Sequence, residues 1–154
     1  MNKRQAYQWA EKRVRAQVER HDDVIAVLAN TAAILKAYRP NFFWVGFYFT
    51  NAERMSLGPF QGPPACVYLS YDHGVCAACA RDRKTVIVPN VHDFDGHVAC
   101  DGRSNSEIVV PVFDAAGELR AVLDVDSEAH ADFDDRDAEG LERIAELLRR
   151  LWPV

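Results

Sequence analysis

The sequence predicts an α+β fold, in which helices from the two ends of the chain cover one face of a central antiparallel sheet. Near both ends, apolar residues recur at the three- and four-residue spacing that is typical of amphipathic helices. Between these regions, short segments rich in β-branched and aromatic residues alternate with turn-forming residues and predict about six strands. A chain of 154 residues that is 49% hydrophobic can build one sizeable core, so we expect residues 1–154 to form a single domain.

Helices are predicted in four places along the chain. Two amphipathic helices open it, one over residues 7–18 and one over residues 24–38, with a break at "HDD" between them. A short helix is expected at "GVCAACARD", residues 74–82. The last helix begins after Asp134, a suitable N-cap, and is weakened by Gly140. Its apolar face is formed by Leu141, Ile144, Ala145, Leu148 and Leu151.

The first strand is predicted at "FFWVGFYFT", residues 42–50, which ends at the turn "NAER". Because side chains alternate along a strand, Trp44, Gly46 and Tyr48 share one face. Room above Gly46 would let a ligand lie between the two aromatic rings, although the rings could instead simply pack under a helix. The other face is expected to be core and carries Phe43, Val45, Phe47 and Phe49. Further strands are expected at residues 55–57, 66–70, 85–88, 106–113 and 118–126.

Acidic residues on the last two strands form a candidate site. If residues 114–117 form a hairpin loop, Glu107 lies directly opposite Asp124, and Asp126 projects from the same face. Opposed carboxylates destabilise a fold and raise at least one pKa unless a cation or hydrogen-bond donors compensate. We therefore favour a site for a small cation, such as the ammonium of a free amino acid, over solvated acids on an edge hairpin. The opposite face of the last strand is expected to be buried by Leu119, Ala121, Leu123 and Val125.

The four cysteines leave three interpretations open. Cys76 and Cys79 supply half of a zinc site, but no second pair at that spacing follows. The same pair could be redox-active, although the parallel sheet of a thioredoxin-like fold is not predicted. In the third interpretation, Cys100 is a nucleophile in an irregular loop, and a second cysteine closes a disulfide after oxidation. A complete zinc site would need further ligands from Cys66, Cys100, His92 or His97.

Charge and hydropathy exclude several classes of partner. The formal net charge is −5, and no Lys/Arg run with interleaved aromatic residues is present, so we expect no nucleic-acid ligand. The N-terminus has no apolar signal core, and no run of about 18 uncharged apolar residues occurs, so we expect no membrane segment and a cytoplasmic location. Thiols are kept reduced in that compartment, which favours a chemical role for the cysteines over structural disulfides.

Five segments carry a family resemblance. In order, they are "NFFWVGFYF", "LGPFQGPPACV", "GVC", "VHDFDGHVACDGRSNSEIVVPV" and "VLDVDS". Together they resemble the signature of the free methionine (R)-sulfoxide reductases, single-domain enzymes with the GAF fold, from about Asn41 to the final helix. The resemblance implies that the chain reduces free methionine (R)-sulfoxide to methionine, uses no cofactor or metal, and is itself reduced by thioredoxin. The resemblance and the apolar first helix also suggest a homodimer.

By this resemblance, Cys100 is the catalytic cysteine, and Cys66 and Cys76 match two others that act in resolution or substrate binding. Glu107 is our choice for the group that protonates the departing sulfoxide oxygen. After "GVC" the family usually continues with Gly-Thr and a small residue, whereas this chain has Ala-Ala and Cys79. Whether Cys66, Cys76 or Cys79 closes the disulfide therefore stays open. The implied substrate pocket comprises Trp44, Tyr48, Glu107, Asp124 and Asp126.

The alternative function is a GAF-type module that binds a small ligand without turnover, or that senses oxidation through the same disulfide. Fold alone does not decide between these functions. Sensory modules usually accompany an output domain, which we do not expect in this chain, and they have no need for several spaced thiols. We therefore favour the enzyme.

Overall fold

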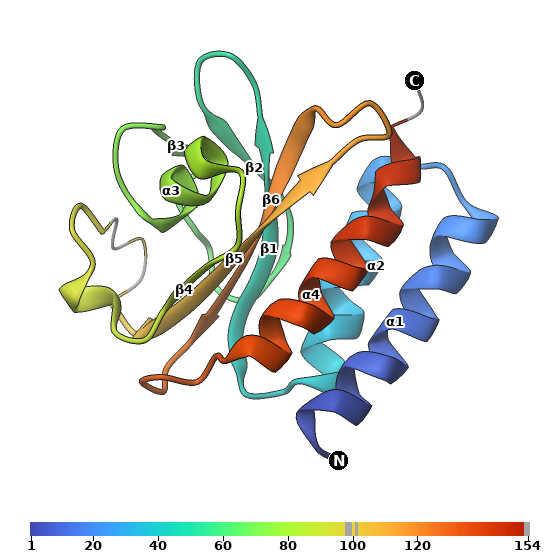
Figure 1. The fold of residues 1–154 in the computed structure, drawn as a ribbon, viewed down its shortest axis with the longest axis horizontal. Coiled ribbons are helices and arrows are strands. Elements are labelled where there is room, and N and C mark those ends of the chain that lie inside the picture. The colour runs from blue at the N-terminus through green and yellow to red at the C-terminus, as the bar shows by residue number, and fades with distance from the viewer. Residues whose placement is uncertain (98–99, 101, 153–154) are drawn as a thin grey trace.

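The computed structural model describes residues 1–97, 100 and 102–152, which build a six-stranded antiparallel sheet (Figure 1). The strands lie in the order β3-β2-β1-β6-β5-β4. The first strand of the chain, β1, and the last, β6, are therefore neighbours at the centre of the sheet. The predicted α+β class and the antiparallel sheet are thus confirmed. The strands are β1 (Phe42–Thr50), β2 (Met55–Gln61), β3 (Tyr68–Leu69), β4 (Val86–Val88), β5 (Ser106–Phe113) and β6 (Leu119–Ser127).

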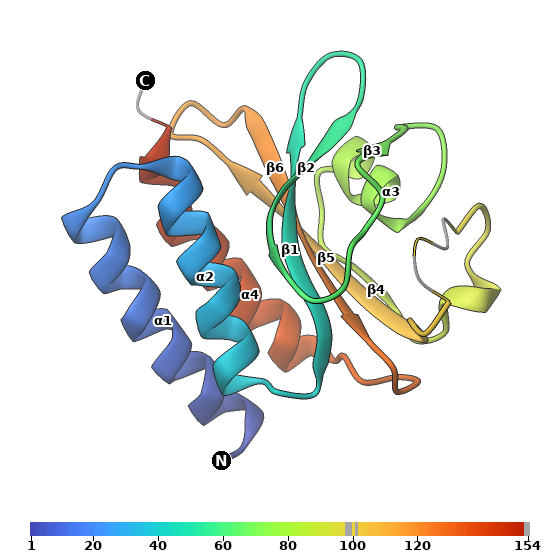
Figure 2. The same cartoon turned by 180° about the vertical axis from the view of Figure 1, so that it is seen from behind.

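Three long helices, α1 (Lys3–Arg20), α2 (Val24–Tyr38) and α4 (Asp135–Leu148), pack together on one face of the sheet. The short helix α3 (Val75–Asp82) lies on the other face, as the two opposite views show (Figures 1 and 2). Asp134 caps α4 through a reciprocal capping box, as its position predicts. No helix in the described part of the chain is long and apolar enough to cross a membrane. Short 3₁₀ turns occur at Val91–Asp93 and Arg149–Leu151.

The main core lies between the sheet and the three long helices. Val45 and Phe47 of β1 and Leu123 of β6 point into it and are fully buried. Helix α4 approaches α1 closely because Gly140 lies beneath the ring of Tyr7, where an added Cβ would stand 2.3 Å from a ring carbon. This contact explains a glycine that helix propensity disfavours.

Several details of the strands differ from the prediction; β2, for example, runs to Gln61 and not only to residue 57. Phe43 is an extra residue in β1 relative to β6, and this β-bulge turns it toward the face of α3, while Phe42 takes a fully buried place in the main core. The third strand spans only Tyr68–Leu69 rather than residues 66–70, because Cys66 is held in the preceding loop by a disulfide and by Tyr48.

The pairing of β5 with β6 is shifted by two residues from the predicted register. Glu107 lies opposite Asp126, and Asp124 lies opposite Val109. The direct opposition of Glu107 and Asp124 was therefore wrong. Because the shift is an even number of residues, all three acids still project from one face of the sheet.

The register shift has a local cause at the end of the hairpin. Phe113 pairs with Leu119 and not with Glu118, so the turn is one residue longer than predicted and gives the first residue of the shift. Val112 pairs with Ala121, so Arg120 is an extra residue without a counterpart on β5 and gives the second. The bulge also turns Leu119 toward the face that carries the acids, where it packs against the smaller core under α3. This corrects the prediction that Leu119 is buried with its alternate neighbours on the helix-covered face.

Candidate active site

A pocket opens on the face of the sheet opposite the long helices, beside α3 and the loops that precede β3 and β5. Its enclosed space measures about 70 Å³, and the whole hollow of about 650 Å³ includes space that is open to solvent. Seven of the eight predicted site residues line the pocket, and the eighth, Cys66, is bonded to one of them. The seven are Trp44, Tyr48, Cys76, Cys100, Glu107, Asp124 and Asp126.

The aromatic side of the pocket is one continuous wall. The rings of Trp44 and Tyr48 stack with centroids 6.0 Å apart, and Trp44 also stacks on Phe60 at 5.3 Å. A Cβ on Gly46 would meet the Phe60 Cβ at 2.4 Å and the Trp44 ring at 2.5 Å, so Gly46 makes room for Trp44 itself. The two rings therefore stack on each other, and the prediction of an open slot between them was wrong.

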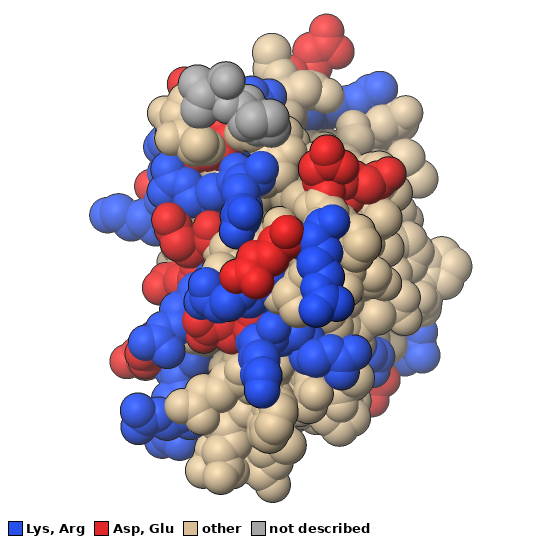
Figure 3. All heavy atoms as spheres, turned by 90° about the vertical axis from the view of Figure 1, so that its right-hand side faces the viewer, with Lys and Arg blue, Asp and Glu red and all other residues tan. Residues whose placement is uncertain are grey.

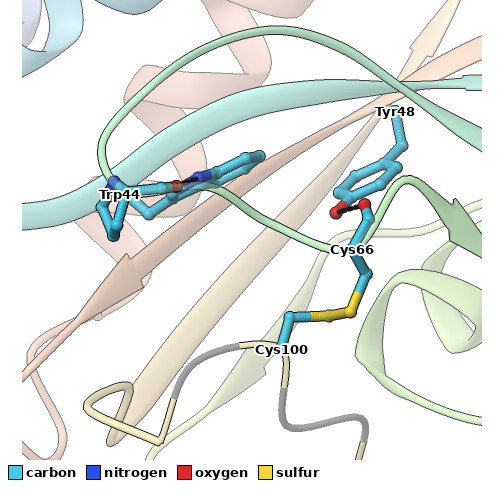
Figure 4. Close-up of a disulfide and its surroundings, with 5 residues drawn as sticks. Trp44, Tyr48, Cys66 and Cys100 are labelled. Atoms are coloured by element: carbon cyan, nitrogen blue, oxygen red, sulfur yellow. Dashed lines mark hydrogen bonds between the residues drawn. A yellow bond between two sulfur atoms is a disulfide. The ribbon is translucent and has the colours of Figure 1, made fainter.

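A disulfide joins Cys66 and Cys100 at the edge of this pocket (Figure 4). It connects the loop before β3 with the loop before β5, across 34 residues, with the two Cα atoms 5.5 Å apart. The Tyr48 hydroxyl donates a hydrogen bond of 2.7 Å to the backbone carbonyl of Cys66, which fixes one half of the disulfide to the sheet. Cys100 itself is exposed, so its side of the disulfide lies nearer to solvent.

The three acids meet at the floor of the pocket, where the neighbouring strands β5 and β6 bring them together. In the sheet, Asp126 lies between Trp44 and Glu107, and Asp124 lies beside Gly46. Glu107 and Asp124 are buried, and Asp126 is partly exposed. Ser104 donates a hydrogen bond of 3.0 Å to Asp126.

Burial disfavours the ionised forms of the acids in this pocket. It raises the pKa of Glu107 well above the ordinary value, and the negative charges of Asp124 and Asp126 raise it further. Burial likewise raises the pKa of Asp124, although hydrogen bonds from Glu107 and Cys76 oppose that effect. Glu107 is thus the acid best suited to carry a proton at neutral pH and to deliver it to a bound molecule.

The two remaining cysteines lie on α3 and are buried. Burial raises the pKa of both thiols, and for Cys76 the nearby charges of Asp124 and Glu107 raise it further. A protonated, buried thiol is a poor nucleophile. Within the described residues, the group with ligand-type geometry combines Cys76 with Glu107 and Asp124, and not with Cys79 or a histidine, so the zinc site considered from the sequence does not form.

Sequence reasoning missed three polar residues that line the pocket. Ser104 is buried against Asp126, and its place between Cys100 and Glu107 in the chain was a usable signal. His97 was considered only as a zinc ligand; burial and the neighbouring His92 lower the pKa of its imidazole, which favours the neutral form. His73 lies just before α3, and no sequence motif around it indicated that it would line the pocket.

The model of the family described as "GAF domain" matches residues 22–151. The chain belongs to the GAF domain family. This GAF protein is 36% identical, over 98% of its length and 91% of the other, to the free methionine-R-sulfoxide reductase of Escherichia coli. It is therefore closely related to the free methionine-R-sulfoxide reductases.

Solved structures agree with this placement. The GAF protein superposes with a TM-score of 0.93 on the free methionine-R-sulfoxide reductase of Neisseria meningitidis in complex with its substrate, at 39% identity, covering 98% of this chain and 90% of that one. The TM-score is also 0.93 for a putative GAF sensor protein of Burkholderia vietnamiensis, at 41% identity, covering 97% and 95% of the two chains. Similarity thus reaches proteins described both as enzymes and as sensors, and the site has to decide between them.

Proposed function

We propose that this GAF protein reduces the (R)-sulfoxide of free methionine to methionine through a cysteine-based mechanism. The observation that carries the proposal is the disulfide between Cys66 and Cys100 at the edge of a pocket that contains three acids and an aromatic wall. A binding module has no need of a thiol pair at the mouth of its ligand pocket. The close relation to the free methionine-R-sulfoxide reductases supports the same conclusion.

In this proposal, the acids recognise the free amino group. Asp124 and Asp126 would hold the substrate ammonium on the pocket floor, where Asp124 presents a buried oxygen, Oδ1, that has no hydrogen-bond partner among the described residues. The methylene and methyl groups of the substrate would lie against Trp44 and Tyr48. Acylation of the nitrogen removes the positive charge, so methionine sulfoxide within a peptide should be rejected.

The reaction begins at Cys100. Its thiolate attacks the sulfoxide sulfur, and Glu107 gives a proton to the departing oxygen. The S–O bond of the substrate breaks and the protonated oxygen is transferred to the Cys100 sulfur, so the sulfoxide is reduced by two electrons and leaves as methionine, while Cys100 is oxidised by two electrons to a sulfenic acid.

The second half of the cycle uses Cys66. Its thiol condenses with the sulfenic acid, which releases water and forms the Cys66–Cys100 disulfide. The pairing favours Cys66 as the resolving cysteine. Cys76 lines the pocket instead, and burial raises the pKa of its thiol, which makes it a poorer nucleophile. Thiol–disulfide exchange with an external dithiol, for which we propose thioredoxin, then restores both thiols.

The test is methionine release from the separate R and S sulfoxides of free methionine, with dithiothreitol as reductant. We expect turnover of the R form alone, complete loss of turnover in Cys100→Ser, and retention in Cys79→Ala, whose side chain does not line the pocket. The N-acetylated R sulfoxide should not be reduced. If the folded and reduced protein turns over neither epimer, the reductase proposal is wrong, and a ligand-binding or redox-sensing module becomes the better account.

A further inference from the structure

The floor of the pocket contains a group of side chains that resembles a metal site. Cys76 of α3, Glu107 of β5 and Asp124 of β6 each offer one ligand atom, and these atoms all lie within 4.8 Å of one another. All three side chains are buried, with exposed fractions of 6%, 5% and 7%. We call these three residues the thiol–carboxylate cluster.

The pocket offers the cluster no lysine or arginine among its described lining residues. Asp124 Oδ1 is buried without a hydrogen-bond partner among the described residues, although an unpaired carboxylate oxygen in an apolar environment is costly. Protons or a bound cation would supply the charge that stabilises the cluster.

We propose that the thiol–carboxylate cluster binds a divalent transition-metal ion such as Zn²⁺. One thiolate and two carboxylates from three different elements form a ligand set that zinc accepts, and because all three residues line the pocket, a fourth ligand can come from the pocket side. The thiolate disfavours Mg²⁺ and Ca²⁺, which prefer oxygen ligands. With the ion bound, three negative ligands and one divalent ion carry a net charge of −1. Without metal, protons on the buried groups would offset the negative charge instead.

The oxidation state of the other cysteines does not remove this site. The disulfide uses Cys66 and Cys100 and leaves the Cys76 thiol free. Metal should therefore bind to the oxidised protein as well as to the reduced one. This feature separates the cluster from a site built on the two disulfide-forming thiols.

Binding would also block the proposed reaction. The ion would occupy Asp124, which the proposed function assigns to the substrate ammonium, and Glu107, which it assigns to proton transfer. This consequence depends on the proposed function, whereas the binding of metal does not. Zn²⁺ should raise the apparent KM for the R sulfoxide in proportion to its concentration and leave kcat unchanged.

The test is a titration of Co²⁺ and Zn²⁺ into the oxidised protein. We expect one ion per chain, a thiolate-to-cobalt absorption band in the near ultraviolet, and release of about one to two protons per ion, measured by calorimetry in buffers of different ionisation enthalpy. Cys76→Ser should lose the band and bind Zn²⁺ at least about tenfold more weakly, because a ligand is removed. The matched control, Cys79→Ser, lies one turn further along the same buried face of α3 and should bind as the wild type does.

The isosteric variant Asp124→Asn tests the cluster without changing a thiol. It should retain its circular dichroism spectrum and lose Zn²⁺ affinity. Unchanged binding in both Cys76→Ser and Asp124→Asn, or binding to the reduced protein only, would overturn the metal site. Because these titrations need no turnover, an inactive protein that binds metal would contradict the proposed reaction and leave the cluster standing.

Discussion

Glu107 shows how one residue can be unfavourable for the fold and useful for chemistry. Its carboxyl group is buried between two other acids, and burial raises its pKa well above the ordinary value. Folding does not require an acid at this position, since the neighbouring apolar residues of β5 fill the cores on both faces. Such a group is typical of a site that holds a proton for transfer.

The raised pKa of Glu107 predicts a pH-dependent gain in stability for Glu107→Gln. Above about pH 4.5 the unfolded chain releases the proton that the folded protein keeps, so wild-type stability falls as the pH rises toward the folded pKa. The glutamine side chain does not ionise, so the stability of the variant does not fall for this reason. Urea unfolding should show little difference between the two proteins at pH 4 and a more stable variant at neutral pH, while sulfoxide reduction is largely lost. The stability of the variant minus that of wild type should therefore increase from pH 4 to neutral pH. A decrease of this difference would contradict the raised pKa.

The pairing of Cys66 with Cys100 predicts a separation between single and multiple turnover in Cys66→Ser. Without Cys66, the sulfenic acid at Cys100 has no partner thiol, so each chain should release about one methionine and then stop when thioredoxin is the reductant. Dithiothreitol, which can reach an exposed sulfenic acid directly, should restore part of the rate. Cys79→Ser serves as the control. Wild-type turnover of Cys66→Ser with thioredoxin would assign resolution to Cys76 instead.

At the scale of elements, the periodicity of the sequence predicted the strands and helices, but it did not predict the β-bulges. The alternation of Trp44 and Tyr48 with core residues predicted the correct face for both, because most of β1 is regular. Phe43 and Arg120 are extra residues that only the pairing partner reveals. The convergence of the acids was predictable because both the expected and the observed register keep Asp124 on the face of the pocket.

The disulfide could not be predicted from spacing. Three thiols remained candidates for the partner of Cys100, and they lie in a loop and on a helix whose positions depend on the whole sheet. The bond between Tyr48 and the Cys66 carbonyl, which is a tertiary contact between β1 and the loop before β3, places one cysteine at the mouth. Cys76 lies instead on α3, facing the acids.

The contact between α4 and α1 predicts a cost for Gly140→Ala. Alanine favours a helix over glycine by about 1 kcal/mol, but its Cβ would collide with the Tyr7 ring. Overpacking of this kind costs about 1–3 kcal/mol, so the variant should unfold at a lower urea concentration than wild type. Gly102→Ala is the control, because no atom lies within 4 Å of the added Cβ. Increased stability of Gly140→Ala would mean that α1 and α4 can move apart freely.

At the scale of the whole molecule, the sheet separates two cores with different tasks. The larger core joins the sheet to α1, α2 and α4, and the smaller one under α3 supports the pocket. On the side formed by the long helices, Lys and Arg side chains alternate with Asp and Glu (Figure 3). The face shown in that view therefore offers no field of a single sign to attract a polyanion.

The disulfide should make stability depend on oxidation. It closes a loop with a sequence separation of 34 residues between two segments at the edge of the pocket. By the chain-entropy account, a loop of this length stabilises the folded state by up to about 4 kcal/mol relative to the reduced protein. Urea unfolding with and without dithiothreitol measures the difference, and Cys66→Ser should not respond to the reductant. Equal stability of oxidised and reduced wild type would show that the unfolded chain is not constrained by this bond.

The strict alternation along residues 121–127 of β6 limits how the length of this chain can vary. Leu123 and Val125 point into the main core, while Asp124 and Asp126 point into the pocket. Deletion of one residue inside this strand would exchange the two faces and drive carboxylates into the apolar layer beneath the helices. Insertions and deletions should therefore be tolerated in the turns at residues 51–54 and 115–117. Within β1, β5 and β6, a one-residue insertion or deletion should prevent folding.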